Sequence, residues 1–208
     1  MGSSGSGRLT AAAGTPRPAP AAEPNDASNV VPSDASLVAA ALEGADWARE
    51  ALFCRHARLA LGLAHRLLPH DSEIDDIVQD CFVSALRQLG TLKNRQAFAG
   101  WLGSIVVHAV RKRLRRRKLL SRLGLRAPEE IDPDAVASPT APPEVAIELR
   151  RVYGLLERLP VEQRIALVLR RVDELEIPEI AAYMGLSIST VKRRLKAAEA
   201  RLEQIGQR

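Results

Sequence analysis

Apolar positions recur every three or four residues along most of the chain, from about residue 37 to the end. This spacing is that of amphipathic helices, and no stretch shows the period-two alternation of a β-strand. The pattern therefore predicts an all-α protein made of two small helical domains. The expected helices cover residues 37–42, 47–68, 72–89, 97–120, 144–158, 161–172, 178–185 and 188–205.

Residues that begin or end helices support several of these boundaries. Pro69 closes the second helix, because proline cannot continue a helix. Ser72 lies three residues before Asp75, which is the spacing of a capping box at the start of the third helix. Gly90 is expected to end that helix, and Ser187 is expected to cap the last one.

Two segments lack the helical pattern. Residues 1–36 are rich in Ala, Pro, Gly and Ser, and so little apolar surface predicts a disordered tail. Residues 121–146 are rich in proline and carboxylates, which predicts a flexible linker. The two domains are accordingly expected at 37–120 and 147–208.

Charge is unevenly distributed along the chain. The net charge is +5, and the excess lies in two basic blocks, 37–118 and 147–208, with an acidic stretch between them. Clustered positive charge indicates nucleic-acid binding better than a basic total does. Only 3% of residues are aromatic, which argues against an aromatic stacking platform for single strands or RNA.

The sequence also limits compartment and chemistry. Two cysteines, Cys54 and Cys81, form no disulfide framework, which fits a reducing compartment. No apolar run is long enough for a membrane span, and no secretory signal is recognisable, so we expect a cytoplasmic protein. The chain ends soon after the last predicted helix, so we expect any signal sensing to lie in another protein.

Residues 177–202 have the parts of a helix-turn-helix in order. Gly185 permits a turn with positive φ, and Pro178 suits the first turn of the preceding short helix. The N-terminal residues of a recognition helix meet base edges in the major groove, where arginine can pair with guanine and lysine with phosphate or guanine. The alternative, a solvated basic face of an ordinary helical hairpin, is less consistent with the Gly-Leu-Ser turn. The candidate DNA-facing residues are Ser189, Thr190, Lys192, Arg193, Arg194 and Lys196.

The fourth predicted helix ends in a run in which seven of the eight residues at 111–118 are cationic. Like charges three or four residues apart repel on a helix, and binding a polyanion relieves that repulsion. A solvated helix end, where cations suit the dipole, is the alternative. About thirty residues upstream, Asp76, Gln79 and Asp80 share one exposed helix face. Carboxylates that faced the phosphates of DNA would be repelled by them, so this acidic face predicts a protein partner.

Metal chemistry and catalysis have little support in the sequence. Glu73, Asp75 and Asp76 could supply the acids of a metal-dependent nuclease or recombinase, but no paired nucleophile or base accompanies them. Cys54, His56 and His65 do not match the spacing of a common zinc site. We therefore expect no catalytic residue, no metal and no cofactor.

Three segments together resemble the extracytoplasmic-function (ECF) sigma factors of bacterial RNA polymerase. DDIVQDCFVSALR, at residues 75–87, is similar to the region 2 helix that docks on the clamp coiled coil of the β′ subunit. FAGWLGSIVVHAVRKRLRRR, at 98–117, resembles the helix that reads and melts the −10 element. Residues 156–202 resemble region 4, which reads the −35 element. No single segment is decisive, whereas three in this order across a proline-rich linker are quite specific.

The resemblance implies a transcription initiation factor and not an enzyme. It implies that 37–120 is region 2, that 147–208 is region 4, and that Asp76, Gln79 and Asp80 dock on polymerase. Implied partners are core RNA polymerase through its β′ clamp and β flap, promoter DNA and an anti-sigma factor. The residues implied at the −10 element are Lys93, Asn94, Arg95, Gln96, Trp101, His108, Arg111, Lys112, Arg113, Arg115, Arg116 and Arg117.

Three positions depart from the family pattern. The family often has Asn at the position of His108, Asp or Asn at that of Lys112, and a serine-like residue at that of Arg193. These departures bear on promoter preference. A helix-turn-helix regulator that works without polymerase is the competing hypothesis, but it gives no role to the acidic face or to the helix at 98–118.

Overall fold

The computed structural model describes residues 31–69, 71–125 and 142–206. Within these ranges the protein contains only helices, as the hydrophobic pattern predicts, and no β-strand. The helices are α1 (Asp34–Leu42), α2 (Asp46–Leu67), α3 (Ile74–Gln88), the 3-10 turns η1 (Leu89–Thr91) and η2 (Arg95–Ala97), α4 (Phe98–Arg122), α5 (Pro143–Glu157), α6 (Val161–Arg171), α7 (Ile177–Met184) and α8 (Ile188–Gly206). None of the helices in these ranges is both long and apolar enough to cross a membrane.

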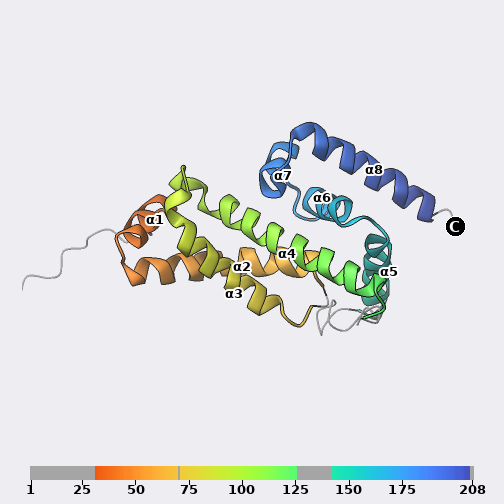
Figure 1. Ribbon diagram of the computed structural model, residues 1–208, viewed down its shortest axis with the longest axis horizontal. Coiled ribbons are helices and arrows are strands. Elements are labelled where there is room, and N and C mark those ends of the chain that lie inside the picture. The colour runs from red at the N-terminus through yellow and green to blue at the C-terminus, as the bar shows by residue number, and fades with distance from the viewer. Residues whose placement is uncertain (1–30, 70, 126–141, 207–208) are drawn as a thin grey trace, which may run out of the picture. The chain divides into compact units, whose positions relative to one another are not determined.

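The N-terminal bundle, defined here as α1–α4, is built around α4. Figure 1 shows α4 with α2 and α3 along one side, and all three pack against one another. Phe98, Leu102 and Val106 of α4 are completely buried, at the three- and four-residue spacing read from the sequence. Phe98 lies between the rings of His56 and Trp101, with ring centroids 5.1 and 6.1 Å away.

A partly buried cluster of polar groups attaches α1 to α2. Asp34 accepts a hydrogen bond from Arg55 at 2.8 Å and pairs with His56 at 3.0 Å. Burial by itself raises the pKa of Asp34, but the hydrogen bonds from Arg55 and His56 outweigh it and hold that pKa below its ordinary value. Asp34 is therefore a charged anchor at the first residue of α1.

The C-terminal bundle, defined here as α5–α8, carries the predicted helix-turn-helix. Ile165 and Leu169 of α6, Ile180 and Met184 of α7, and Val191 of α8 are fully buried and form its core. Gly185 has φ +62° between α7 and α8, a left-handed conformation that glycine adopts without steric cost. The backbone N–H of Thr190 donates to Ser187 Oγ at 3.2 Å, so Ser187 caps α8 as predicted.

Four boundary predictions were wrong. The tail was expected to be disordered to residue 36, yet Ser33 caps α1 by accepting the N–H of Ser36; residues 1–30 lie outside the described ranges. The linker was expected at 121–146, but α4 continues to Arg122 and α5 begins at Pro143; residues 126–141 are not described.

The third error concerns the start of α3. No capping box forms at Ser72: the carboxylate of Asp71 accepts the N–H of Glu73 at 3.1 Å, and the helix begins at Ile74. A capping box does form at α7, where Glu176 and Glu179 each accept the other's backbone N–H. Helix α3 also ends at Gln88, two residues before the predicted stop, because the chain tightens into η1.

Candidate nucleic-acid and polymerase interfaces

Two arginines of the basic run converge on one buried carboxylate. Arg113 contacts both oxygens of Asp71, at 2.8 and 3.1 Å, and Arg117 contacts Asp71 Oδ2 at 2.9 Å. The side chain of Asp71 is only 1% exposed. Arg113 also pairs with Glu73 at 2.8 Å. These contacts fix the C-terminal half of α4 to the segment that precedes α3.

The electrostatic environment of this cluster favours its charged forms. Burial alone raises the pKa of Asp71, but hydrogen bonds from Arg113 and the Glu73 N–H, with the charge of Arg117, bring that pKa below its ordinary value. Hydrogen bonds from Asp71 and Glu73 raise the pKa of Arg113. Asp71 thus stays ionised, as a bidentate arginine partner requires.

We expect Asp71→Asn to lower the free energy of unfolding by about 2–3 kcal/mol at pH 7. The lowered pKa of Asp71 means that its stabilising effect is complete above the ordinary value of 3.8 and is lost as the pH falls below it. Urea denaturation of both proteins between pH 7 and pH 3 measures this difference. The two stabilities should converge toward pH 3, and a gap that stays constant with pH would contradict the assignment.

Arg111 and Arg115 face a carboxylate of the other bundle. Both pair with Glu162 of α6, Arg111 at 3.3 Å. Arg111 also donates to the backbone carbonyl of Met184 at 2.8 Å. Burial of Arg111 lowers the pKa of its guanidinium despite the charge of Glu162. Lys112 and Arg116 are exposed, so the basic run has both paired and solvent-facing members.

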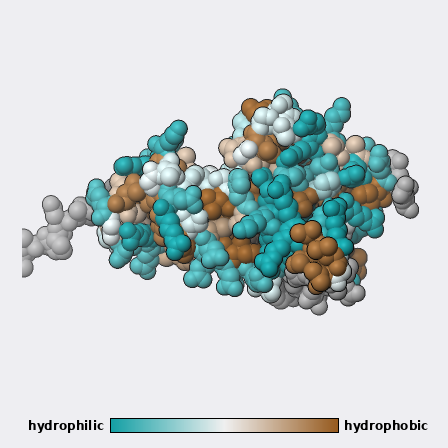
Figure 2. Space-filling view, viewed as in Figure 1, coloured by the Kyte–Doolittle hydropathy of each residue, from teal (hydrophilic) through white to brown (hydrophobic). Residues whose placement is uncertain are grey.

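The predicted −10 residues lie along α4 and do not gather in one pocket. Lys93, Asn94, Arg95 and Gln96 are all exposed in and beside η2, where Asn94 Oδ1 accepts the N–H of Gln96 at 3.1 Å. The arginine cluster begins about four helical turns further on, roughly 25 Å along the axis. Figure 2 shows hydrophilic side chains along this part of the molecule, with a hydrophobic patch toward the C-terminal end of α4, where Leu119 and Leu123 are exposed. A strip of this length can follow a strand of nucleic acid.

Trp101 and His108 lie between the two ends of this strip. Trp101 is half-buried against the core, as its apolar position predicts. His108 is exposed, and its Nδ1–H donates to the carbonyl of Ser104 at 2.7 Å. His108 also lies beside Gly185 of the C-terminal bundle.

The recognition helix α8 presents its predicted polar face. Lys192, Arg193 and Lys196 are exposed, while Val191 is completely buried on the opposite side. The hydroxyls of Ser189 and Thr190 lie 3.0 and 2.8 Å from Ser187 Oγ and belong to the capping network. Arg194 differs from its neighbours because it pairs with Glu162 of α6.

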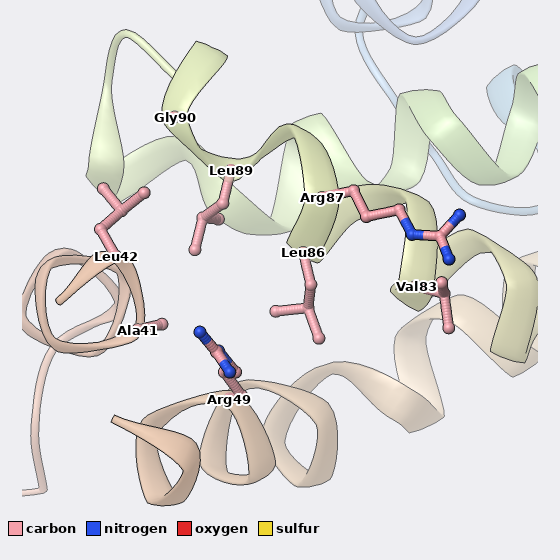
Figure 3. A pocket seen from close by; sticks show the side chains of 8 residues that line it. All are labelled: Ala41, Leu42, Arg49, Val83, Leu86, Arg87, Leu89 and Gly90. Carbon is pink, nitrogen blue, oxygen red and sulfur yellow. The ribbon is translucent and has the colours of Figure 1, made fainter. Parts of the chain in front are cut away.

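The acidic face of α3 is exposed and continues toward an apolar groove. Asp76, Gln79 and Asp80 all face solvent. The groove lies between α1, α2, α3 and η1. Leu86 of α3 and Leu89 of η1 point into it, and Arg49 and Arg87 also line it (Figure 3). Among the described residues no three His, Cys, Asp or Glu side chains are arranged to hold a metal ion.

Comparison with known proteins gives these surfaces a family. The model for sigma-70 region 2 matches residues 52–119, and the model for sigma-70 region 4 matches residues 149–202. The ECF RNA polymerase sigma factor SigM of Mycobacterium tuberculosis is 39% identical over 83% of this chain and 84% of its own length. The chain belongs to the ECF RNA polymerase sigma factors. It is a transcription initiation factor that binds core RNA polymerase and directs it to promoters through −10 and −35 elements.

Other relatives are similar to this sigma factor over most of its length. The ECF sigma-E factor of Escherichia coli K12 is 31% identical over 81% of this chain and 92% of its own. Among solved structures, CnrH in complex with the cytosolic domain of CnrY is similar, with a TM-score of 0.58, 29% identity, and coverage of 84% of this chain and 97% of CnrH. RpoE of Bartonella quintana, solved with the anti-sigma factor NepR, shares the fold at a TM-score of 0.57 and 20% identity, over 76% of this chain and 96% of its own.

Sequence reasoning missed the acidic partners of the basic helix. Asp71 is 42 residues from Arg113, and Glu162 is 47 residues from Arg115. No local pattern marks either carboxylate. The density of the arginine run was the available signal, because so many like charges on one helix require counter-charges from somewhere.

Proposed function

We propose that the two bundles of this sigma factor have different functions. The N-terminal bundle, within residues 37–120, is region 2; it docks on polymerase through α3 and grips the −10 region along α4. The C-terminal bundle, within 147–208, is region 4 and reads the −35 element with α8. The observation that carries this proposal is the separation of one exposed acidic face on α3 from two basic surfaces on α4 and α8.

The docking face is proposed at Asp76, Gln79 and Asp80. These side chains are exposed, and they repeat at the three- and four-residue spacing that places them on one side of α3. The adjacent groove could accept an apolar side chain of the polymerase, because Leu86 and Leu89 line it. A protein surface with cationic side chains around an apolar residue would match both features.

The nucleic-acid surfaces are proposed as follows. Lys93, Asn94, Arg95 and Gln96 would hold bases of the −10 element, because they form an exposed loop at the N-terminus of α4. That contact would continue along the helix through Trp101, His108, Arg111, Lys112, Arg113, Arg115, Arg116 and Arg117. The surface that faces the −35 element would consist of Ser189, Thr190, Lys192, Arg193, Arg194 and Lys196.

Regulation, chemistry and location complete the proposal. CnrH was solved with the cytosolic domain of CnrY, and the RpoE of B. quintana with an anti-sigma factor, so we propose that an anti-sigma factor also controls this protein. The protein acts in the cytoplasm, where polymerase works. It initiates transcription without enzymatic activity of its own and needs no cofactor.

The test of the docking face is binding to core RNA polymerase by Asp76→Arg/Asp80→Arg. Reversing two exposed charges should weaken binding by about a hundredfold, since each repulsive contact costs about 1–2 kcal/mol. Immobilised native protein and mutant are compared for retention of purified core enzyme. The double mutant Glu50→Arg/Glu203→Arg, which makes the same charge change at exposed positions of α2 and α8, is the control and should bind normally.

Two outcomes would change the proposal. Equal loss in both double mutants would mean that net charge, and not the α3 face, controls binding. No retention of polymerase by the native protein, with duplex DNA still bound, would favour a helix-turn-helix regulator that acts without polymerase.

A further inference from the structure

The basic run of α4 has a side that faces the core of the N-terminal bundle. Val110 and Leu114 are 0% and 7% exposed and mark this core side of the helix. Arg113 and Arg117 each follow one of them by three residues, so they share that side. The side chains of these arginines are only 17% and 18% exposed. Two of the cations in the run therefore lie against the bundle.

Lys112 and Arg116 lie on the other side of the same helix. Each is two residues from a buried position, and a helix turns by about 100° per residue, so these side chains project away from the core. Both are exposed. Like Arg113 and Arg117 they are four residues apart, so the two pairs have the same spacing and differ by a rotation about the helix axis.

One buried carboxylate neutralises the core-side pair. The side chain of Asp71 is 1% exposed; it accepts hydrogen bonds from Nε and Nη2 of Arg113 at 2.8 and 3.1 Å and pairs with Nη2 of Arg117 at 2.9 Å. The remaining guanidinium nitrogen of Arg113, Nη1, pairs with Glu73 at 2.8 Å. All three nitrogens of that guanidinium are therefore held by carboxylates of the N-terminal bundle.

Transfer of these arginines to a phosphate would leave Asp71 without its counter-charge. A buried carboxylate that loses its hydrogen-bonded partner is strongly destabilised, because water cannot replace that partner. The transfer would also break the bidentate contact of Arg113, which is one of the stronger kinds of ion pair. Lys112 and Arg116 can contact a phosphate without either loss.

We propose that Asp71 withholds Arg113 and Arg117 from nucleic acid. The backbone contacts in this part of α4 are then made by the solvent-side cations, Lys112 and Arg116 among them, while the core-side pair holds the helix in position. Asp71 thereby limits the number of phosphates bound by a segment in which seven of eight residues are cationic. The inference rests on the proposed role of α4 at the −10 element and separates its cations into contacting and positioning residues.

The test compares two double mutants, Lys112→Gln/Arg116→Gln and Arg113→Gln/Arg117→Gln, which remove the same charge from adjacent positions of one helix. Affinity for a fluorescein-labelled, mixed-sequence 30-nucleotide single strand is measured by fluorescence anisotropy at about 50 and 200 mM salt. Each lost phosphate contact lowers the slope of log affinity against log salt by about 0.7. The ratio of the two affinities should therefore fall about sevenfold in the solvent-side mutant and stay unchanged in the core-side mutant.

A second variant guards against misfolding of the core-side mutant, in which Asp71 is buried without a counter-charge. Asp71→Asn/Arg113→Gln/Arg117→Gln replaces the whole cluster by amides, which can hydrogen-bond to one another. Circular dichroism verifies that each variant is folded. The triple mutant should keep the ratio of affinities of the native protein, because none of its substitutions removes a phosphate contact.

Asp71→Asn on its own gives the opposite prediction. It releases Arg113 and Arg117 for phosphate, so binding should tighten and the ratio of affinities should rise, by up to about sevenfold for two new contacts. A merely structural loss would weaken binding and would not steepen its salt dependence. The control Asp75→Asn removes the same charge from an exposed position of α3 and should leave the ratio nearly unchanged.

The outcomes distinguish this inference from the proposed function. A decrease of the ratio in Arg113→Gln/Arg117→Gln as large as in Lys112→Gln/Arg116→Gln would overturn the inference and leave α4 as a nucleic-acid surface. An unchanged or lower ratio in Asp71→Asn would also overturn it. If neither double mutant lowers the ratio, α4 does not grip nucleic acid, and its proposed role fails together with the inference.

Discussion

Replacing Phe98 by alanine should lower the free energy of unfolding of the N-terminal bundle by about 3–5 kcal/mol, the cost of deleting a buried aromatic ring. Phe98 is completely buried at the first residue of α4, beside the rings of His56 and Trp101. The surrounding side chains come from different helices, so they cannot all move inward to fill the space. A small domain is stable by only about 5–15 kcal/mol, so the loss should leave the bundle partly unfolded on warming.

Tryptophan fluorescence during urea denaturation is the appropriate measurement. Both tryptophans, Trp47 and Trp101, belong to the N-terminal bundle, so the signal reports that bundle even if the two unfold separately. Phe53→Ala is the matched control: Phe53 is 44% exposed, and its ring centroid lies 4.8 Å from that of Phe82. The free energy of unfolding of Phe53→Ala should be lower than that of the native protein by about 1 kcal/mol. Equal losses would show that Phe98 does not hold the core together.

The hydrophobic pattern predicted the helices well because each of them has an apolar stripe. Phe98, Leu102 and Val106 follow the three- and four-residue spacing that predicted the helix, and all three are completely buried. Local chemistry also identified Gly185 and Ser187, whose backbone angle and hydroxyl end one helix and begin the next. Such features depend on a few neighbouring residues and can therefore be read from sequence.

Features that depend on distant partners could not be predicted. The capping box expected at Ser72 does not form; Asp71 instead accepts the Glu73 N–H and pairs with Arg113, 42 residues away. The basic run was predicted as a polyanion-binding surface, and nothing local indicated that Glu162 would reach it. Likewise, no local pattern marks Gly103, although a Cβ added to it would lie 2.4 Å from Tyr183 Cε1.

These internal contacts show how the charges of the arginine run are balanced within the protein. Its charges are too dense for a free helix, and carboxylates satisfy them in the isolated protein as phosphates would on DNA. Asp71 lies within the N-terminal bundle and can keep Arg113 and Arg117 aligned in either state. Glu162 lies in the other bundle and pairs with Arg111 and Arg115. Four arginines of the run thus have carboxylate partners within the protein.

Removing three cationic side chains from the recognition helix should nearly abolish specific duplex binding. For Lys192→Ala/Arg193→Ala/Lys196→Ala, a loss of about 1–1.5 kcal/mol per contact gives about a thousandfold weaker binding. The slope of log K against log salt should also fall by about 2–3, because as many phosphate contacts can be lost. The three side chains are exposed, so folding should not change. The probe is a duplex selected by the native protein from a random 40-base-pair library, and affinity is measured by fluorescence anisotropy.

The control is Arg150→Ala/Arg158→Ala/Arg171→Ala, which removes three exposed cations from α5, the turn after it and α6. Its net charge equals that of the first triple mutant, so non-specific attraction to DNA falls equally in both. Only the loss of contacts in the major groove distinguishes them. Similar weakening in both would mean that overall charge, and not the face of α8, determines duplex binding. Retention of core polymerase should be normal in both triple mutants, because the proposed docking face is on α3 and none of the six residues lies there.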